Sequence, residues 1–167
     1  YSVFAARGIK RTAQALDLVR DARGKQLYKA VGRGNRVLSQ NDADLITQAL
    51  QGVVTGGTGT GAALFDRPAA GKTGTAENFQ DAWFCGFVPQ LVTCVWVGFP
   101  HREIPLLGVE GYGEVFGGTI PASIWHDFMT VALANVPVES FPTAYDHGSA
   151  VSGGGYYQPT TPSYTPP

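Results

Sequence analysis

Two consecutive apolar segments near the middle of the chain most constrain how it can fold. Residues 82–88 (AWFCGFV) and 91–98 (LVTCVWVG) each have the length of a strand and are rich in aromatic and β-branched side chains. Only Pro89 and Gln90 separate them, so we expect an antiparallel hairpin. In the first segment both alternating sets of side chains are apolar, which predicts a strand covered on both faces. Residues 67–77 should hold a further strand.

A cation, hydroxyls and glycines are concentrated just before this hairpin, in Ala70-Gly71-Lys72-Thr73-Gly74-Thr75-Ala76. Lysine and threonine can hold an anionic substrate, and glycine lets that substrate approach the backbone closely. A phosphate-binding loop would need a glycine five residues before the Gly-Lys-Thr, but Asp66 stands there, and strands follow instead of a helix. Two interpretations remain, a solvated turn and the Lys-Thr-Gly strand of penicillin-interacting enzymes.

The surrounding sequence resembles the C-terminal part of the transpeptidase domain of penicillin-binding proteins. The resemblance is carried by residues 70–98 (AGKTGTAENFQDAWFCGFVPQLVTCVWVG), and the Asp-Ala-Trp-Phe within them is most similar to the class A, bifunctional type. It extends through residues 45–61 and 117–133 and fades after Val138. It implies an α+β, penicillin-binding/serine β-lactamase-like fold, with antiparallel strands of the central sheet and a packed C-terminal helix. Residues 1–140 would be the C-terminal portion of the domain, and 141–167 a tail rich in Gly, Tyr, Thr and Pro.

The resemblance also implies a function, a peptidoglycan D,D-transpeptidase that cross-links stem peptides by acyl transfer and binds β-lactam antibiotics. Lys72 and Thr75 would be catalytic, and Lys72, Thr73, Gly74 and Thr75 would bind substrate. Lys72 would supply a positive field, the two threonine hydroxyls would hold the substrate carboxylate, and the Thr75 N–H would donate to the oxyanion. Strand alternation places Thr73 and Thr75 on one side and Lys72 on the other, and an edge strand bordering the cleft would permit all three to reach it.

The activated nucleophile of such an enzyme is missing from these 167 residues. The reaction needs a serine followed three residues later by a lysine, and no serine here has one. We therefore expect the chain to work with an upstream part of the same protein, which would carry that pair, a glycosyltransferase domain and an N-terminal membrane anchor. The enzyme would then act on the extracytoplasmic face of the cytoplasmic membrane. The alternative is a non-catalytic module on the same fold that binds cell wall or senses β-lactams.

Composition limits the other possible functions. The formal charge is −1, which gives no reason to expect nucleic acid as a partner. No apolar run has membrane-spanning length. His101 and His126 stand apart from any cluster of carboxylates or cysteines, so no metal is expected, and the resemblance implies no cofactor.

Local signals predict further elements around this core. Residues 1–7 form the end of a helix closed by Gly8, residues 15–20 and 25–30 a hairpin, and residues 121–135 an amphipathic helix, while residues 101–118 look irregular. A helix should start at Ser39, which has capping-box spacing to Asp42. Ser39-Gln40-Asn41 matches the family's Ser-x-Asn motif in letters but lies too close to Lys72, so we assign Ser39 as a helix cap. Residues 149–167 indicate a tail or linker.

The two cysteines of the chain fall opposite each other in the expected hairpin. With a two-residue turn at Pro89-Gln90, Val88 faces Leu91, and the same register pairs Cys85 with Cys94 as non-hydrogen-bonded neighbours. Such neighbours come within reach of a disulfide, which would persist outside the cytoplasm. The alternative is a pair of reduced cysteines that act as small apolar residues.

Overall fold

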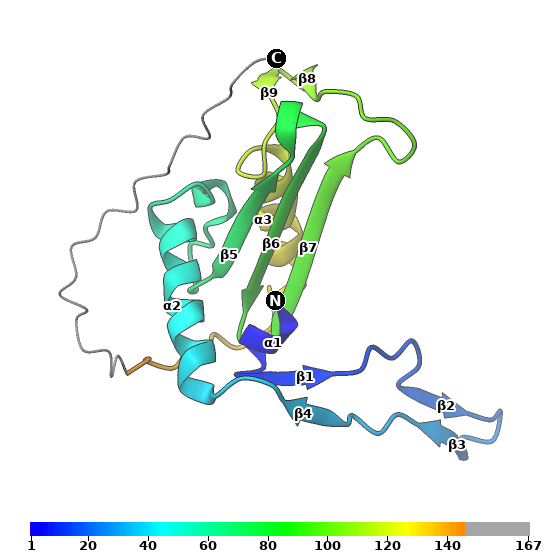
Figure 1. Ribbon diagram of the computed structural model, residues 1–167. Coiled ribbons are helices and arrows are strands. Elements are labelled where there is room, and N and C mark those ends of the chain that lie inside the picture. The colour runs from blue at the N-terminus through cyan, green and yellow to red at the C-terminus, as the bar shows by residue number, and fades with distance from the viewer. Residues whose placement is uncertain (146–167) are drawn as a thin grey trace, which may run out of the picture.

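The computed structural model describes residues 1–145 and shows a three-stranded sheet with helices around it and an extended arm (Figure 1). The helices are α1 (Ser2–Ala5), α2 (Gln40–Thr55) and α3 (Ile120–Ala132), with 3-10 turns η1 (Thr60–Ala62) and η2 (Glu77–Phe79). The strands are β1 (Ile9–Arg11), β2 (Leu18–Arg20), β3 (Gln26–Lys29), β4 (Gly34–Arg36), β5 (Ala70–Thr75), β6 (Asp81–Val88), β7 (Leu91–Gly98), β8 (Leu107–Val109) and β9 (Tyr112–Glu114). The fold is α+β, as expected.

The central sheet has the order β5-β6-β7 with both pairs antiparallel. The expected hairpin is confirmed, because β6 and β7 pair from Val88 opposite Leu91 through to Asp81 opposite Gly98. The strand predicted within residues 67–77 is β5, which pairs along its whole length with β6. The cation-containing segment therefore forms one edge of this sheet.

The main hydrophobic core lies between one face of this sheet and α3 (Figure 1). Phe84 of β6 and Trp125 of α3 are fully buried and meet edge to face, with ring centroids 5.3 Å apart. The Trp125 indole N–H also reaches the carbonyl oxygens of Gly86 at 3.3 Å and Thr93 at 3.1 Å. A side chain on Gly86 would run into the Trp125 ring, so glycine lets the helix approach the sheet closely. This helix is the one predicted from residues 121–135, and its Pro121 lies in the first turn.

The opposite face of the sheet is only partly covered, which corrects the expectation of a strand covered on both sides. Phe87 is buried there and meets the ring of Phe141 at a centroid distance of 5.6 Å. Farther along the same face, Trp83 is 45% exposed and Trp96 on β7 is 38% exposed. The apolar alternation in β6 therefore reflects a core on one face and an exposed aromatic surface on part of the other.

The two predicted helices near the N-terminus are confirmed, and α2 lies beside β5 (Figure 1). Ser39 caps α2, with its Oγ accepting a hydrogen bond from the backbone N–H of Asp42 at 3.0 Å. The end of α1 differs from the expected glycine cap, because Arg7 takes the left-handed position after the C-cap (φ 50°) and Gly8 follows it with φ +90°, its N–H donating to the Val3 carbonyl oxygen. Arg7 then joins the two helices through a double hydrogen bond to Asp44, at 3.0 and 2.7 Å.

Residues 9–37 form an arm that projects away from the sheet (Figure 1). The hairpin predicted at residues 15–30 is present as β2 and β3, and the turn of residues 21–25 closes it. At the base of the arm, β1 pairs with β4. Sequence analysis missed this pairing, because the two strands are only three residues long and lie more than twenty residues apart.

Residues 101–118, expected to be irregular, contain a second short hairpin formed by β8 and β9. Glu110 and Gly111 form its two-residue turn, and both have positive φ. Positive φ at both central residues is typical of the type I′ turn, whose backbone twist matches that of the flanking strands. Within the described part of the chain, none of the helices combines the length and apolar character that crossing a membrane requires. The tail was expected to span residues 141–167. Residues 146–167 lie outside the part of the chain that the structure describes.

Candidate functional site

β5 places the Lys72-Thr73-Gly74-Thr75 segment on an exposed edge of the sheet. Its only strand partner among residues 1–145 is β6, so no second strand pairs with its other edge in that part of the chain, although α2 packs beside it. Lys72 and Thr75 are exposed, while Thr73 and Gly74 are partly exposed. β5 is thus a terminal strand of the sheet, the position that would permit side chains from both faces to reach one border.

The structure brings Lys72 and Thr73 together despite their opposite directions along the strand. The Lys72 Nζ lies 2.9 Å from the carbonyl oxygen of Thr73 and 3.4 Å from its Oγ1. Thr73 Oγ1 also forms a 2.7 Å hydrogen bond with Thr58 Oγ1, from the loop that follows α2. Among the described residues, no carboxylate comes within ion-pairing distance of Lys72. An ammonium and two hydroxyls therefore converge at this point without an internal counter-ion.

Thr75 is positioned by the loop that precedes α3. The backbone N–H of Gly117 donates to Thr75 Oγ1 at 3.2 Å. Gly117 packs directly on the backbone of Gly74 and Trp83, because an added Cβ there would collide with those peptide groups. Sequence analysis did not identify Thr58 or Gly117 as part of this site. The only available signal was that each lies in a glycine-rich segment.

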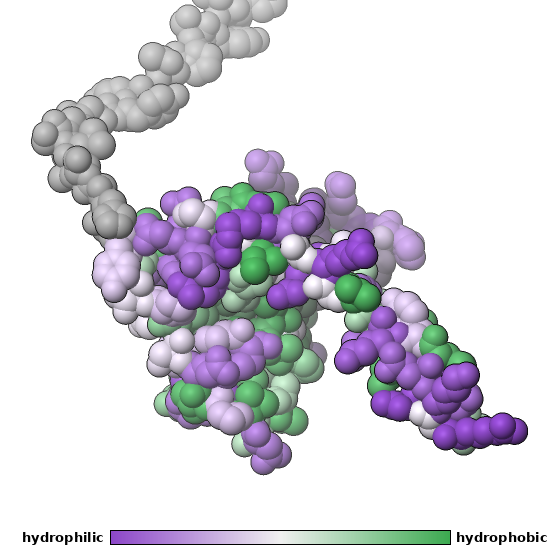
Figure 2. Space-filling model, turned by 90° about the horizontal axis from the view of Figure 1, so that it is seen from below, coloured by the Kyte–Doolittle hydropathy of each residue, from purple (hydrophilic) through white to green (hydrophobic). Residues whose placement is uncertain are grey.

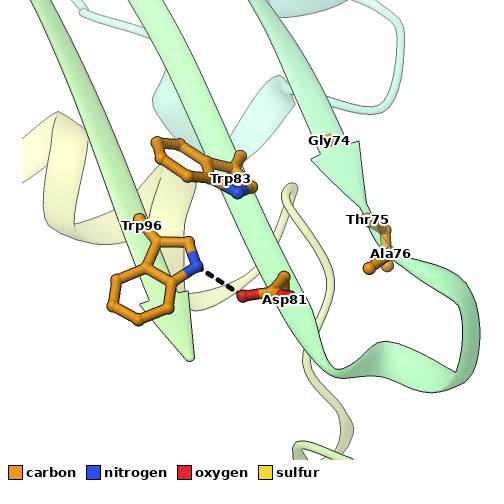
Figure 3. Close-up of a pocket in the computed structure, with 6 residues that line it drawn as sticks. All are labelled: Gly74, Thr75, Ala76, Asp81, Trp83 and Trp96. Atoms are coloured by element: carbon orange, nitrogen blue, oxygen red, sulfur yellow. Dashed lines mark hydrogen bonds between the residues drawn. The ribbon is translucent and has the colours of Figure 1, made fainter. Parts of the chain in front are cut away.

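A hollow of about 600 Å³ lies on the open face of the sheet, next to the end of β5 (Figure 3). It is lined by Gly74, Thr75, Ala76, Asp81, Trp83 and Trp96. The indole N–H of Trp96 donates to Asp81 Oδ1 at 2.6 Å, and the rings of the two tryptophans are tilted, with centroids 6.2 Å apart. Beside the edge segment, the candidate site therefore has an aromatic wall with one carboxylate. Sequence analysis interpreted the two tryptophans only as strand residues of the hairpin and not as part of a site.

The two cysteines occupy the positions that the hairpin register predicts. Cys85 lies opposite Cys94, and the expected register is confirmed. Their Cα atoms are 4.0 Å apart, and the two sulfur atoms are joined in a disulfide. Cys85 also pairs with Lys72 of β5, so the disulfide joins β7 to the strand that supports the edge segment.

The groups whose pKa is clearly displaced lie outside the candidate site. The hydrogen bond from Arg67 holds the pKa of Asp66 below its usual value. The hydrogen bond to Asp44 raises the pKa of Arg7 further above its ordinary value. Arg67 also donates to the carbonyl oxygens of Leu133 and Val136, at 3.2 Å each. These pairs fasten helices and loops to one another and are structural.

Comparison with known proteins gives a consistent result. Residues 1–110 match the family described as "Penicillin binding protein transpeptidase domain". Penicillin-binding protein 1A of Neisseria flavescens is 36% identical over 163 residues, which cover 94% of this chain and 19% of that protein. Penicillin-binding protein 1A of Aquifex aeolicus is 36% identical over 141 residues, covering 84% of this chain and again 19% of the relative. The chain thus spans about a fifth of the length of these relatives.

Solved structures agree with the sequence relatives. The PonA1 protein of Mycobacterium tuberculosis, solved in complex with penicillin V, superposes with a TM-score of 0.78 at 30% identity, covering 87% of this chain and 39% of that one. Penicillin-binding protein 1A of Haemophilus influenzae gives a TM-score of 0.70 at 27% identity, covering 85% of this chain and 26% of that one. The chain belongs to the penicillin-binding protein transpeptidase family. Its resemblance to the class A type is confirmed by these relatives.

Proposed function

We propose that this chain is the Lys-Thr-Gly-bearing part of a peptidoglycan D,D-transpeptidase. The observation that carries the proposal is the exposed edge of β5, on which Lys72, Thr73, Gly74 and Thr75 stand in the order typical of the family. An edge strand with free backbone groups can accept an extended peptide as an added strand. A stem peptide that ends in D-alanyl-D-alanine has the shape and the terminal carboxylate that such an edge would bind.

Each residue of the edge has a distinct role in this proposal. The ammonium of Lys72, close to the Thr73 hydroxyl and without an ion pair among residues 1–145, attracts the substrate carboxylate. The hydroxyls of Thr73 and Thr75 bind that carboxylate, and the Thr75 N–H donates to the oxyanion that forms during acyl transfer. Gly74 has no side chain that would keep the substrate backbone away from the strand.

The reaction itself needs a serine from outside these 167 residues. The serine oxygen forms an ester with the carbonyl carbon of the penultimate D-alanine, and the terminal D-alanine leaves with the proton. An amine of a second stem peptide then attacks the ester, forms the cross-link and returns the serine. A β-lactam would enter by the same first step, with the ring amide bond broken in place of the peptide bond.

The remaining parts of the proposal concern the setting. The serine–lysine pair, a glycosyltransferase domain and a membrane anchor would lie upstream in the same protein, and the enzyme would act on the extracytoplasmic side of the membrane. Residues 1–140 would form the C-terminal portion of the transpeptidase domain, and residues 141–167 a tail beyond it. The share of the relatives' length that this chain matches, about a fifth, supports further parts in the same protein.

Fluorescent penicillin tests the proposal directly. The complete protein should form a stable covalent adduct, and residues 1–167 alone should form none, because they contain no serine with a lysine three positions later. Stable labelling of a hydroxyl within residues 1–167 would contradict the assignment of the nucleophile. If the complete protein binds penicillin without any covalent adduct, the chain belongs to a non-catalytic module that senses β-lactams.

A further inference from the structure

The arm of residues 9–37 differs sharply in charge from the rest of the chain. It holds eight of the twelve Lys and Arg residues but only two of the thirteen Asp and Glu residues. The arm therefore carries a formal charge of +6, and the remainder of the chain carries −7. We call residues 9–37 the basic arm. Its charge is hidden in the net value of −1 for the whole chain.

The positive charges of the basic arm face solvent and form no ion pair within residues 1–145, although Arg11, Arg20 and Arg36 donate to backbone carbonyl oxygens. All eight cationic residues are exposed: Lys10, Arg11, Arg20, Arg23, Lys25, Lys29, Arg33 and Arg36. Among residues 1–145 the two ion pairs join Arg7 to Asp44 and Arg67 to Asp66, and neither involves the arm. Of the arm's own carboxylates, Asp21 accepts hydrogen bonds from two backbone N–H groups of the hairpin turn. The arm thus projects an uncompensated positive field.

Part of this charge converges on one hollow at the base of the arm. The hollow has a volume of about 670 Å³ and is lined by Lys10, Arg11, Thr12, Arg33, Asn35 and Val37. Three cations and two polar side chains without a carboxylate provide the donors that an oxyanion requires. Like charges held this close repel one another, and a bound anion would relieve that repulsion.

The apolar residues of the arm indicate what kind of anion fits. Leu16, Leu27 and Val31 are each more than 60% exposed, and the surface of the arm mixes hydrophilic and hydrophobic residues (Figure 2). The tip of the arm, residues 21–25, is charged and carries no large apolar side chain. A surface that inserts into a bilayer would place apolar residues at its tip. The pattern instead suits a hydrated polymer with carboxylates and small apolar groups.

We infer that the basic arm is a docking surface for peptidoglycan strands, which it holds through the carboxylates of their stem peptides. This inference rests on the proposed function, since a strand that presents many stem peptides presents a carboxylate at the end of each one. The arm lies away from β5 (Figure 1), so it binds a different part of the polymer from the peptide at the catalytic edge. Its effect is to keep the substrate polymer near the enzyme between reactions.

A matched pair of charge-removing variants of the complete protein tests the inference. Lys10→Gln with Arg33→Gln removes two cations of the hollow whose side chains make no hydrogen bond within residues 1–145. Arg102→Gln is the control, because it removes one exposed arginine outside the arm. It is compared with Arg33→Gln alone, which removes one exposed arginine of the arm. Binding to purified peptidoglycan is measured by co-sedimentation at about 50 mM salt, where screening is weak.

We expect each arm cation to contribute about two- to fivefold in affinity, so the double variant should bind roughly tenfold more weakly. Arg102→Gln should bind like the parent. Peptidoglycan whose carboxylates have been converted to amides should bind the parent and the double variant alike. Equal losses for Arg33→Gln and Arg102→Gln would overturn the inference. So would tighter binding of the parent to vesicles of phosphatidylglycerol than to peptidoglycan, which would indicate a membrane-binding arm.

Acylation by fluorescent penicillin separates this inference from the proposed function. The double variant should be acylated at the parental rate, because neither substituted residue lies at the β5 edge. If the parent is acylated but arm variants retain full affinity for peptidoglycan, the docking role is wrong and the enzyme assignment stands. If the parent is not acylated, the enzyme assignment fails, and the comparison of Arg33→Gln with Arg102→Gln still decides what the arm binds.

Discussion

Gly117 offers the sharpest test of how the candidate site is held together. It is buried in the loop between β9 and α3, and its N–H donates to Thr75 Oγ1. A Cβ at this position would fall 2.7 Å from the backbone nitrogen of Gly74 and 2.8 Å from its oxygen, and it would also collide with the carbonyl oxygen of Trp83. All three are backbone atoms of the sheet, so no side chain can rotate away to make room.

We therefore expect Gly117→Ala to lower the free energy of unfolding by about 1–3 kcal/mol, the range typical of overpacked sites. For a chain of this size each 1 kcal/mol lowers the melting temperature by about 2–4 °C, so a decrease of roughly 2–12 °C should follow. Gly113→Ala is the matched control, because nothing lies within 4 Å of a Cβ built there. Thermal unfolding followed by circular dichroism should place the control within about 2 °C of the parent.

The same substitution should also affect the chemistry. Relief of the collision requires either the loop or the strand at Gly74 to move, and both movements disturb the groups that would hold the substrate. In the complete protein, Gly117→Ala should slow acylation by fluorescent penicillin, while Gly113→Ala should not. A Gly117→Ala protein that melts with the parent and is acylated at the parental rate would refute the reasoning, because the loop and β5 could then separate without cost.

Three further substitutions test other parts of the structure. Lys72→Ala in the complete protein should slow acylation by about 10²–10³ in stopped-flow labelling, with the melting temperature unchanged, and a rate within a few-fold of the parent would remove Lys72 from the site. Ser39→Ala should cost about 1 kcal/mol in urea unfolding without changing acylation, since Ser39 is a helix cap. Alkylation of the unreduced protein should modify neither Cys85 nor Cys94, and replacing both with Ser should cost about 2–3 kcal/mol; two alkylated thiols would show that the disulfide is absent.

The sequence predicted best those elements whose causes are local. A two-residue gap at Pro89-Gln90 was enough to set the whole register of β6 and β7, because antiparallel pairing propagates from the turn. Ser39 marked the start of α2 because a serine side chain satisfies a free N–H of the first turn. The edge position of β5 followed from the family resemblance, together with the chemistry that Lys72 and Thr73 must perform.

The features that sequence reasoning missed depend on contacts between distant segments. Gly117 contacts Gly74 across more than forty residues, and no local pattern distinguishes it from the other glycines of its loop. The exposure of Trp83 was also missed, since an apolar alternation does not reveal whether another layer covers each face. The β8–β9 turn at Glu110-Gly111 could have been recognised, because a glycine in a two-residue gap is a known hairpin signal.

The separation of charge in the basic arm has a consequence for how the molecule orients. A positive arm extending from a negative body gives the chain a large electric dipole, even though its net charge is close to zero. Near an anionic polymer this dipole produces a torque that turns the arm toward the polymer before contact, over roughly the 10 Å screening length at 0.1 M salt. The same polarity should let cation-exchange and anion-exchange resins both retain the protein near neutral pH.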